Sequence, residues 1–424
     1  MKVERVIERV YDRRRLRWAW ARVRANAGAA GIDQMTVEEF EERQEELLEL
    51  LHQKLKAGTY RFKPARRAKI PKPGSSKKRE LGIPVVMDRT VSQSLHLVLE
   101  EIWTSDFTGS NFGFRRGKSQ HQAIEHVRKA VVEGYEWCAA IDLRGFFDEI
   151  PHPLVLRLLR RKIGDEQLIT LVARALKAGV VVDGVFEKTT KGCPQGSPVS
   201  PMLSNIVLNE LDQELQRRGH RYCRWADDFI IVLKSQRAAE RVMQSITTFL
   251  EAKLGLPVNQ EKSQVALVKE VEFLSFSILR GQIRVSTKAR KRFKNRVREL
   301  TRRNNGQSMH EIIESLNEYL RGWASYFRVQ EFKKIFRELD EFIRSRLRSM
   351  QLKKWKKPAK FQRMMIRAGY PADEARRTWV RMNKWQSVMR RQVRFVLNLK
   401  WFRRAGLLLL DDFTQRNLRL QFAR

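Results

Sequence analysis

Two adjacent acids, Asp227 and Asp228, interrupt the aromatic and aliphatic stretch RWADDFIIV at residues 224–232. Residues 222–225 and 229–233 have the composition of two short strands, which predicts that 226–228 lie at or near the tip of a hairpin. A turn can direct both carboxylates toward one site, whereas consecutive side chains within a strand point to opposite faces. Two carboxylates about 4 Å apart repel by on the order of 4 kcal/mol at an effective dielectric near 20, so we expect a compensating cation. The alternative is an ordinary polar turn, since Asp is a common turn residue.

A third acid, Asp142, ends the apolar run of residues 137–141 in WCAAIDLRGFFDEIPH. It could simply cap the next helix. However, acids at the ends of buried strands also supply the oxygen ligands that Mg²⁺ prefers. In two-metal catalysis, ions roughly 3.5 to 4 Å apart activate an attacking hydroxyl and stabilise the leaving oxygen. In a basic protein, these acids indicate phosphoryl or nucleotidyl transfer on nucleic acid.

The elements that would position these acids change in type along the chain. Residues 1–56 have helical spacing with a break at NAGAAGIDQMT, where Thr36 and Glu39 fit a capping box. The next segment is rich in Pro, Gly, Lys and Arg, which predicts extended strands joined by a basic hairpin. From about 85 to 280, helical stretches alternate with short strands in an α+β pattern, and after 285 the chain is helical and basic.

The charge of the chain narrows the class of partner. Its 424 residues include 85 Lys and Arg against 48 Asp and Glu, a formal net charge of +37. Such an excess favours an anionic partner, and nucleic acid is the first candidate. No apolar run approaches the roughly 18 residues of a spanning helix, and the N-terminus lacks the apolar core of a signal peptide, so we expect a cytoplasmic protein with no membrane partner. The three cysteines are far apart, which argues against a disulfide or zinc site.

A series of short motifs resembles those of reverse transcriptases encoded by bacterial group II introns. RWADD is similar to their Tyr-Ala-Asp-Asp box, and AAIDLRGFFDEIPH resembles the catalytic block that precedes it. The other motifs, in the family's order, are NAGAAGIDQMT, IPKPGSSKKRELGIPVVMDR, SNFGFRRGKSQHQA, GCPQGSPVSPMLSNIVLNELD, LPVNQEKSQV, VEFLSFSI and the maturase-like LNEYLRGWASYF. No single motif decides the resemblance, but the ordered set spans nearly the whole chain. Because no Cys/His-rich segment follows, the resemblance is to the class without a C-terminal endonuclease domain.

The resemblance implies roles for the acids and for one aromatic residue. Asp142 and Asp227 would hold two Mg²⁺ ions, and Asp228 would complete the triad. Phe147 matches the aromatic residue that blocks a ribose 2′-hydroxyl and so selects deoxynucleotides. An isolated Phe at this position would more simply be a core residue.

Four further residues match positions that contact the incoming nucleotide in this family. Lys72 and Arg79, in the basic hairpin, would clamp the triphosphate. Gln195 would pack against the nucleotide, and Lys262 would protonate the departing pyrophosphate. Without the resemblance, each would be interpreted as an ordinary loop or surface residue.

The C-terminal part of the chain combines a predicted helical bundle with basic segments. Residues 284–303 contain Glu299 as their one acid, which indicates contact with a phosphate backbone. Four tryptophans among Lys and Arg suit stacking on nucleic acid, with burial as the equal alternative; they are Trp355, Trp379, Trp385 and Trp401. The buried face of a thumb helix is predicted at helical spacing by Met309, Ile312, Leu316, Leu320, Trp323 and Phe327.

We therefore expect an α+β right-hand polymerase with fingers, an antiparallel palm sheet, a thumb and a helical basic C-terminal domain. The expected parts are an N-terminal extension with the first part of the fingers at 1–85, a fingers and palm core at 86–280, a helical thumb or maturase region at 286–350 and a basic DNA-binding domain at 351–424.

The expected function is that of an RNA-directed DNA polymerase, a nucleotidyltransferase that uses dNTPs, an RNA template and a DNA primer or target. The resemblance also implies binding of group II intron RNA as a maturase in splicing and retrohoming. One alternative is a related reverse transcriptase recruited to DNA repair or phage defence, which departures from the family pattern at Arg116, Trp225 and Ser275 leave open. The other is a non-catalytic RNA-binding splicing factor, against which the intact acids argue.

Overall fold

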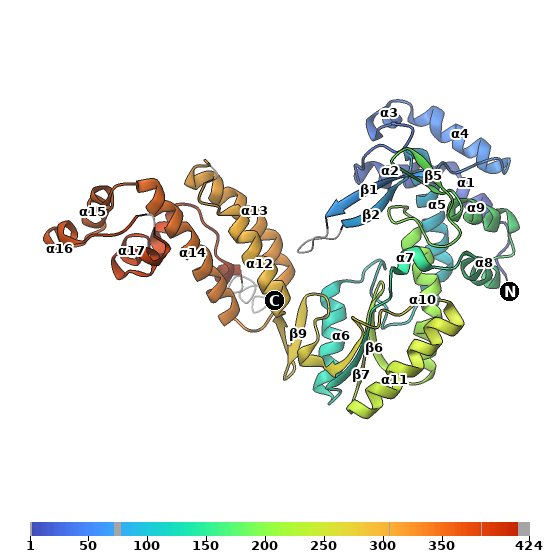
Figure 1. The fold of residues 1–424 in the computed structure, drawn as a ribbon. Helices are drawn as coiled ribbons and strands as arrows, with labels where there is room; N and C mark the ends of the chain where they lie inside the picture. Colours follow the sequence, from blue (N-terminus) through green and yellow to red (C-terminus); the bar gives the residue numbers. More distant parts are fainter. Residues whose placement is uncertain (1, 72–77, 305, 383, 414–424) are drawn as a thin grey trace, which may run out of the picture. The chain divides into compact units, whose positions relative to one another are not determined.

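Helices occupy most of the first 56 residues of the computed structural model, which describes residues 2–71, 78–304, 306–382 and 384–413 (Figure 1). They are α1 (Val6–Tyr11), α2 (Arg13–Ala25), α3 (Val37–Glu42) and α4 (Gln44–Lys56). The predicted capping box is present at the start of α3. The Glu39 N–H donates to the Thr36 hydroxyl, and the Thr36 N–H donates to the Glu39 carboxylate.

A mixed four-stranded sheet follows, in the order β2-β1-β4-β5. Its strands are β1 (Ala65–Pro71), β2 (Lys78–Ile83), β4 (Val180–Val182) and β5 (Val185–Glu187). β1 and β2 are antiparallel, as the predicted hairpin requires, whereas β1 pairs in parallel with the distant β4. Arg79 lies opposite Ile70 in the hairpin. Lys72 lies outside the described residues.

The second four-stranded sheet is antiparallel throughout, in the order β6-β7-β3-β8, and it confirms the predicted palm sheet. Its strands are β3 (Trp137–Ile141), β6 (Arg221–Trp225), β7 (Asp228–Leu233) and β8 (Gln264–Leu267). The central strands are apolar because helices cover the sheet: α11 (Gln236–Thr248) packs against β3, β7 and β8, and α6 (Gln120–Val132) packs against β6. The two central strands carry the candidate acids at one end of the sheet.

Further helices connect and cover the two sheets. They are α5 (Val86–Trp103), α7 (Phe146–Glu149), α8 (His152–Lys162), α9 (Glu166–Leu176) and α10 (Ser200–Arg217), with the short 3-10 helices η1 (Thr104–Asp106) and η3 (Val268–Glu270) and the π-helix η2 (Phe249–Lys253). One hydrophobic core, from Val6 to Val258, joins α1–α5, α7–α11, η2 and the strands β3, β6 and β7. This core belongs to the first of two compact units, Met1–Phe273 and Leu274–Arg424.

The second unit begins with the strand pair β9 (Phe276–Leu279) and β10 (Gln282–Val285) and is otherwise helical. Its helices are α12 (Thr287–Leu300), α13 (Met309–Phe327), α14 (Lys334–Trp355), α15 (Pro358–Arg367), α16 (Ala372–Arg377), η4 (Trp385–Met389), α17 (Arg391–Val396) and α18 (Leu399–Arg404). The predicted apolar face of α13 is buried except for the half-buried Met309. Its Trp323 contacts Phe293 of α12 and Phe336 of α14, with ring centroids 4.6 and 5.6 Å apart.

The sequence-based boundaries differ in detail from these units. The division between the two compact units falls after Phe273, whereas the fingers and palm core was expected to end at residue 280. α14 also runs without interruption across residue 350, where the basic C-terminal domain was expected to begin. In the part of the chain that the structure describes, no helix is both long and apolar enough to cross a membrane.

The three cysteines are buried free thiols of the first unit. Burial raises the pKa of Cys138 and of Cys193 to about 12, and it raises the pKa of Cys223 still further. Their environment is that of small core residues.

Candidate active site

The stretch RWADDFIIV forms the predicted hairpin, with Ala226 and Asp227 as its two-residue turn. Trp225 at the end of β6 pairs with Asp228 at the start of β7. Ala226 has a φ of 56°, a left-handed conformation that is uncommon for a residue with a Cβ. The turn leaves Asp227 half-buried and Asp228 exposed.

Asp142 follows the last residue of β3 and lies beside this hairpin. β3 and β7 are antiparallel with Ile141 opposite Phe229, so continuing the register by one residue places Asp142 opposite Asp228. Cross-strand neighbours of this kind have side chains on one face of the sheet. The Asp142 N–H donates to the Ser263 hydroxyl (3.1 Å), and the Asp142 carbonyl accepts from the Asn259 N–H (2.8 Å). These two bonds tie the end of β3 to the loop that carries Lys262.

The electrostatics of these residues favour binding of an added cation. Although Asp228 is exposed by surface area, the protein around its carboxyl removes part of the hydration of that group. This desolvation, and then the charges of Asp227 and Asp142, raise the pKa of Asp228 to about 6. Glu272 adds to this repulsion, whereas Lys262 opposes it. The Lys262 ammonium lies 3.2 Å from a carboxylate oxygen of Asp142, although its side chain is two-thirds exposed.

The oxygen atoms of these carboxylates are of the type that a divalent metal ion such as Mg²⁺ binds. Within the described ranges, no three His, Cys, Asp or Glu side chains stand close enough together to hold an ion as they are. Mg²⁺ in nucleotide-transfer sites is held by one or two carboxylates, and waters and substrate phosphates complete its coordination. Two or three aspartates at adjacent strand ends therefore suffice as the protein's share of such a site.

Phe147 and Gln195 form a second group beside the first turn of α7. Phe147 is half-buried, and its carbonyl accepts from the Cys193 N–H at 2.7 Å. The Gln195 amide lies 3.4 Å from a carboxylate oxygen of Asp148, and the Gln195 carbonyl accepts from the Gly82 N–H at 2.8 Å. Gly82 belongs to β2, so the Pro-Gln-Gly turn is attached to the strand that carries Arg79.

The segment Gly113–Phe114, to which the sequence assigned no role, links the two groups. A Cβ on Gly113 would lie 2.0 Å from the backbone nitrogen of Ala226, so only glycine lets this segment approach the hairpin so closely. Phe114 has a φ of 54° and is 46% exposed, and its ring centroid lies 6.4 Å from that of Phe147. The motif SNFGFRRG marks this segment in the sequence. Its close approach to the hairpin could not be predicted, because the only trace of such a backbone contact in a sequence is the glycine itself.

Comparison with known proteins adds an independent line of evidence. Residues 70–278 match the family model "Reverse transcriptase (RNA-dependent DNA polymerase)", and residues 290–368 match "Group II intron, maturase-specific domain". Protein YkfC of Escherichia coli (strain K12) is 32% identical over 61% of this chain and 78% of its own length. The chain belongs to the group II intron reverse transcriptase and maturase family.

Other relatives of this reverse transcriptase and maturase are more distant. The group II intron-encoded protein LtrA of Lactococcus lactis subsp. cremoris is 29% identical over 65% of this chain and 57% of its own length. The putative COX1/OXI3 intron 1 protein of Saccharomyces cerevisiae is 29% identical over 54% of this chain and 34% of its own length. The match therefore spans about half of LtrA and a third of the yeast protein. The reverse transcriptase model covers all three acids, and enzymes with this domain generally use divalent metal ions.

The maturase-specific match covers most of α12 and all of α13 and α14, where cationic side chains are exposed. On α12, Ala289, Phe293 and Val297 are buried, whereas Lys288, Lys291 and Arg296 are exposed. Beyond this helix, the four tryptophans considered for stacking differ in exposure. Trp355 is buried and Trp401 half-buried, but Trp379 and Trp385 are 57% and 42% exposed. Trp379 lines a cavity of about 630 Å³ with Lys353, Lys356, Arg381 and Lys384.

Proposed function

We propose that this chain is an RNA-directed DNA polymerase that extends a DNA primer along an RNA template with dNTPs. The observation that carries the proposal is the meeting of Asp142, Asp227 and Asp228 at the ends of the two central palm strands, inside a reverse transcriptase domain. In the reaction, the primer 3′-hydroxyl attacks the α-phosphate of the nucleotide, and pyrophosphate leaves.

Asp142 and Asp227 are the proposed ligands of two Mg²⁺ ions, with Asp228 completing the acidic set. When bound, such ions activate the attacking hydroxyl and stabilise the leaving oxygen. Repulsion among the three acids supports this assignment, because it is relieved when cations bind.

The remaining assignments concern the nucleotide. Lys262 would protonate the departing pyrophosphate, and its contact with Asp142 would keep it beside the acids. Phe147, on the first turn after Asp142, would lie against the sugar and exclude a 2′-hydroxyl. Gln195 would pack against the nucleotide, and Arg79 and Lys72 of the basic hairpin would hold its triphosphate.

Primer extension on an RNA template with dNTPs and Mg²⁺ tests the polymerase proposal. The Asp227→Asn substitution keeps the shape of the side chain and removes its charge, so we expect extension to disappear while the melting temperature is retained. The matched control is Asp183→Asn in the β4–β5 turn, an exposed acid of the other sheet, which should extend like the natural protein. Equal extension by the Asp227→Asn and natural proteins would rule out this role for the hairpin.

We further propose that the second unit binds group II intron RNA as a maturase, because the maturase-specific match coincides with the exposed cations of α12. This activity requires no chemistry from the acids. The Asp227→Asn protein should therefore bind a self-splicing group II intron RNA as tightly as the natural protein, measured by filter binding against duplex RNA of equal length. No preference for the intron RNA would remove the maturase role and leave the polymerase proposal intact.

A further inference from the structure

A buried ion pair lies directly behind the hairpin of the candidate active site. The side chains of Arg224, on β6, and Asp212, on α10, are both 0% exposed. The Arg224 Nε donates to one carboxylate oxygen of Asp212 at 2.8 Å, and an Nη donates to the other. Arg224 is among the largest fully buried side chains of the chain's described residues, which is rare for arginine.

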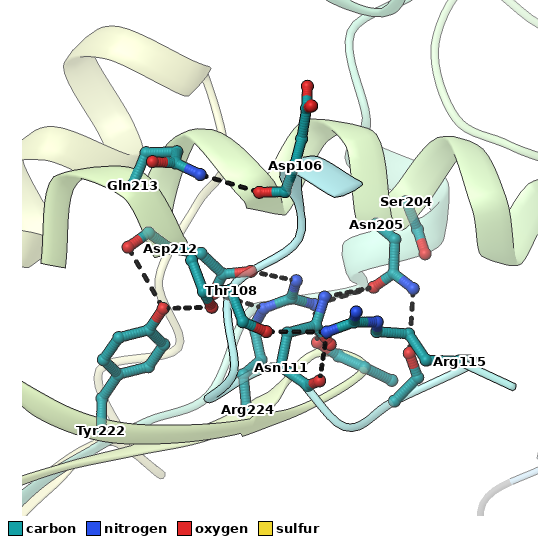
Figure 2. A network of polar contacts seen from close by, with 12 residues as sticks. Asp106, Thr108, Asn111, Arg115, Ser204, Asn205, Asp212, Gln213, Tyr222 and Arg224 are labelled. Atoms are coloured by element: carbon teal, nitrogen blue, oxygen red, sulfur yellow. Dashed lines mark hydrogen bonds and ion pairs between the residues drawn. The ribbon is translucent and has the colours of Figure 1, made fainter. Parts of the chain in front are cut away.

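The rest of the guanidinium is directed at the turn that carries Asp227. Its second Nη donates to the carbonyl of Ala226 at 2.9 Å and to the Asn205 side-chain oxygen at 3.0 Å. Asn205 in turn donates to the Gly113 carbonyl at 2.9 Å, and Gly113 lies against the Ala226 backbone. Asn205 and Asp212 are seven residues apart on α10 and so face the same side of that helix. Figure 2 shows these side chains converging on Arg224.

The backbone on the other side of β6 completes the enclosure. The Arg224 N–H donates to the Ser110 carbonyl, and the Arg224 carbonyl accepts from the Phe112 N–H, both at 2.9 Å. Arg115 donates to the carbonyls of Thr108 and Asn111 at 2.7 and 3.0 Å, which holds the 108–115 segment in its folded conformation (Figure 2). Arg224 is therefore held from both α10 and the 108–115 segment.

We propose that Arg224, held by Asp212 and Asn205, is a positioning residue that fixes the Ala226 turn and thereby the carboxylates of Asp227 and Asp228. This inference rests on the proposed polymerase function. A buried ion pair is weak evidence for stability, because a well-packed apolar pair of similar volume is often as stable or more so. An apolar pair cannot donate hydrogen bonds. A planar guanidinium binds both carboxylate oxygens and still has an N–H for a third acceptor.

The turn requires such a contact because of its conformation. Ala226 adopts a left-handed φ that L-residues disfavour, so the turn is held by its surroundings and not by its own preference. Without the hydrogen bond to the Ala226 carbonyl, we expect the turn to relax and the two carboxylates to lose their fixed spacing. Misplacement of reacting groups by about 1 Å costs roughly 100-fold in rate.

The test compares two variants of the full-length protein. Arg224→Met combined with Asp212→Leu replaces the pair by apolar side chains and removes the contact to Ala226 without leaving a buried charge. Arg224→Lys keeps the charge, but its compact ammonium lacks the planar fork that spans both Asp212 oxygens and the Ala226 carbonyl. The control is Tyr60→Phe, which removes a buried hydrogen bond to Asp88 in the same unit but outside this network.

Three measurements are made on each variant: thermal melting, amide hydrogen exchange of peptides covering residues 222–232, and single-nucleotide incorporation on a preformed primer–template. For both Arg224 variants we expect a melting temperature close to the natural one, faster exchange in the turn, and a kcat lower by about 10- to 100-fold. The dNTP KM and the primer–template affinity should stay unchanged. Tyr60→Phe should alter neither the exchange of the turn nor kcat.

The outcomes separate this proposal from the proposed function. Natural exchange in the turn and a natural kcat in either folded variant would overturn the positioning role. If the apolar variant does not fold, Arg224→Lys decides between a positioning role and a purely structural one. In a purely structural role only the charge matters, so lysine would restore both the natural stability and the natural kcat. If the natural protein does not extend primers at all, the polymerase proposal fails, and the exchange of the turn alone decides whether Arg224 holds it.

Discussion

At the scale of single residues, Phe147 differs in exposure from the core aromatic residue next to it. Its ring is half-buried and meets Phe146 and Phe114 edge-on, with centroids 5.3 and 6.4 Å away. A purely structural Phe would be enclosed, as Phe146 is at 3% exposure. The open side of Phe147 is thus available to a nucleotide sugar.

Shortening Phe147 tests its proposed role in sugar selection. Phe147→Ala should admit ribonucleotides and lower the preference for dNTPs over rNTPs by at least about 10-fold, because the 2′-hydroxyl no longer meets a ring. The measurement is single-nucleotide incorporation with each sugar. Phe186→Ala, at an exposed Phe of β5, is the matched control and should keep the natural preference. An unchanged preference in Phe147→Ala would assign this residue to packing alone.

Asp88 provides a pH-dependent test of the first unit. Burial raises the pKa of its carboxyl from 3.8 to about 7, although the Tyr60 hydroxyl and the Lys63 N–H donate to it at 2.5 and 2.8 Å. A raised carboxyl pKa means that the folded state holds the proton more tightly than the unfolded state. The contribution of Asp88 to stability is therefore present below about pH 4 and is lost as the pH rises toward 7.

Substitution by asparagine removes this titration. The quantity to compare is the difference in the free energy of unfolding between the natural protein and Asp88→Asn. As the pH rises from 5 to 8, this difference should decrease by on the order of 1 kcal/mol or more. Urea denaturation at the two pH values measures it, and subtracting the variant cancels the other titrating groups. A difference that is independent of pH would show that Asp88 is already ionised in the folded protein at pH 5.

At the scale of elements, the hairpin packs closely against the 108–115 segment. Gly113→Ala should displace the Ala226 turn, because the added Cβ would overlap its backbone nitrogen. We expect a fall in kcat of about 100-fold with the fold retained, measured by primer extension and circular dichroism. Gly109→Ala is a control in the same segment, since a Cβ there meets nothing within 4 Å. Equal activity of the two variants would contradict the close fit.

Sequence patterns were sufficient for elements whose signals are local. The hairpin, the capping box at Thr36 and the apolar face of α13 follow from alternation, spacing and turn composition over a few residues. The partners of Arg224 do not follow from such local patterns. An arginine beside an acidic motif would ordinarily be assigned to the surface, and its burial is decided by α10 and the 108–115 segment, which only the tertiary structure brings to β6. The parallel pairing of β1 with β4, more than 100 residues away, was beyond local patterns for the same reason.

At the scale of the whole molecule, the candidate acids belong to the first unit, and the exposed Trp379 with its surrounding cations belongs to the second. The Arg381 guanidinium lies 5.7 Å from the Trp379 ring centroid, which leaves a charged and aromatic surface suited to single-stranded nucleic acid. The sequence could not decide which tryptophans were buried, because Trp355 and Trp379 lie among similar basic neighbours.

Removal of this ring should weaken binding without affecting chemistry. Trp379→Ala is expected to reduce the binding free energy for single-stranded DNA by about 1 to 3 kcal/mol, the value of one stacked base. Fluorescence anisotropy measures it, and single-nucleotide incorporation at saturating primer–template should stay natural. Trp18→Ala is the matched control, because Trp18 is 47% exposed in the first unit with Arg22 over its ring at 4.8 Å. Equal losses in both variants would show that stacking is not specific to Trp379.

The burial of all three cysteines makes the natural protein well suited to site-specific labelling. Thiol reagents attack the thiolate, and Cys138, Cys193 and Cys223 are both inaccessible and protonated near neutral pH. Cysteines introduced at exposed lysines, such as Lys54 in the first unit and Lys288 in the second, would react first. A donor and acceptor dye at these positions would report the distance between the units before and after a primer–template is added, without removal of any native cysteine.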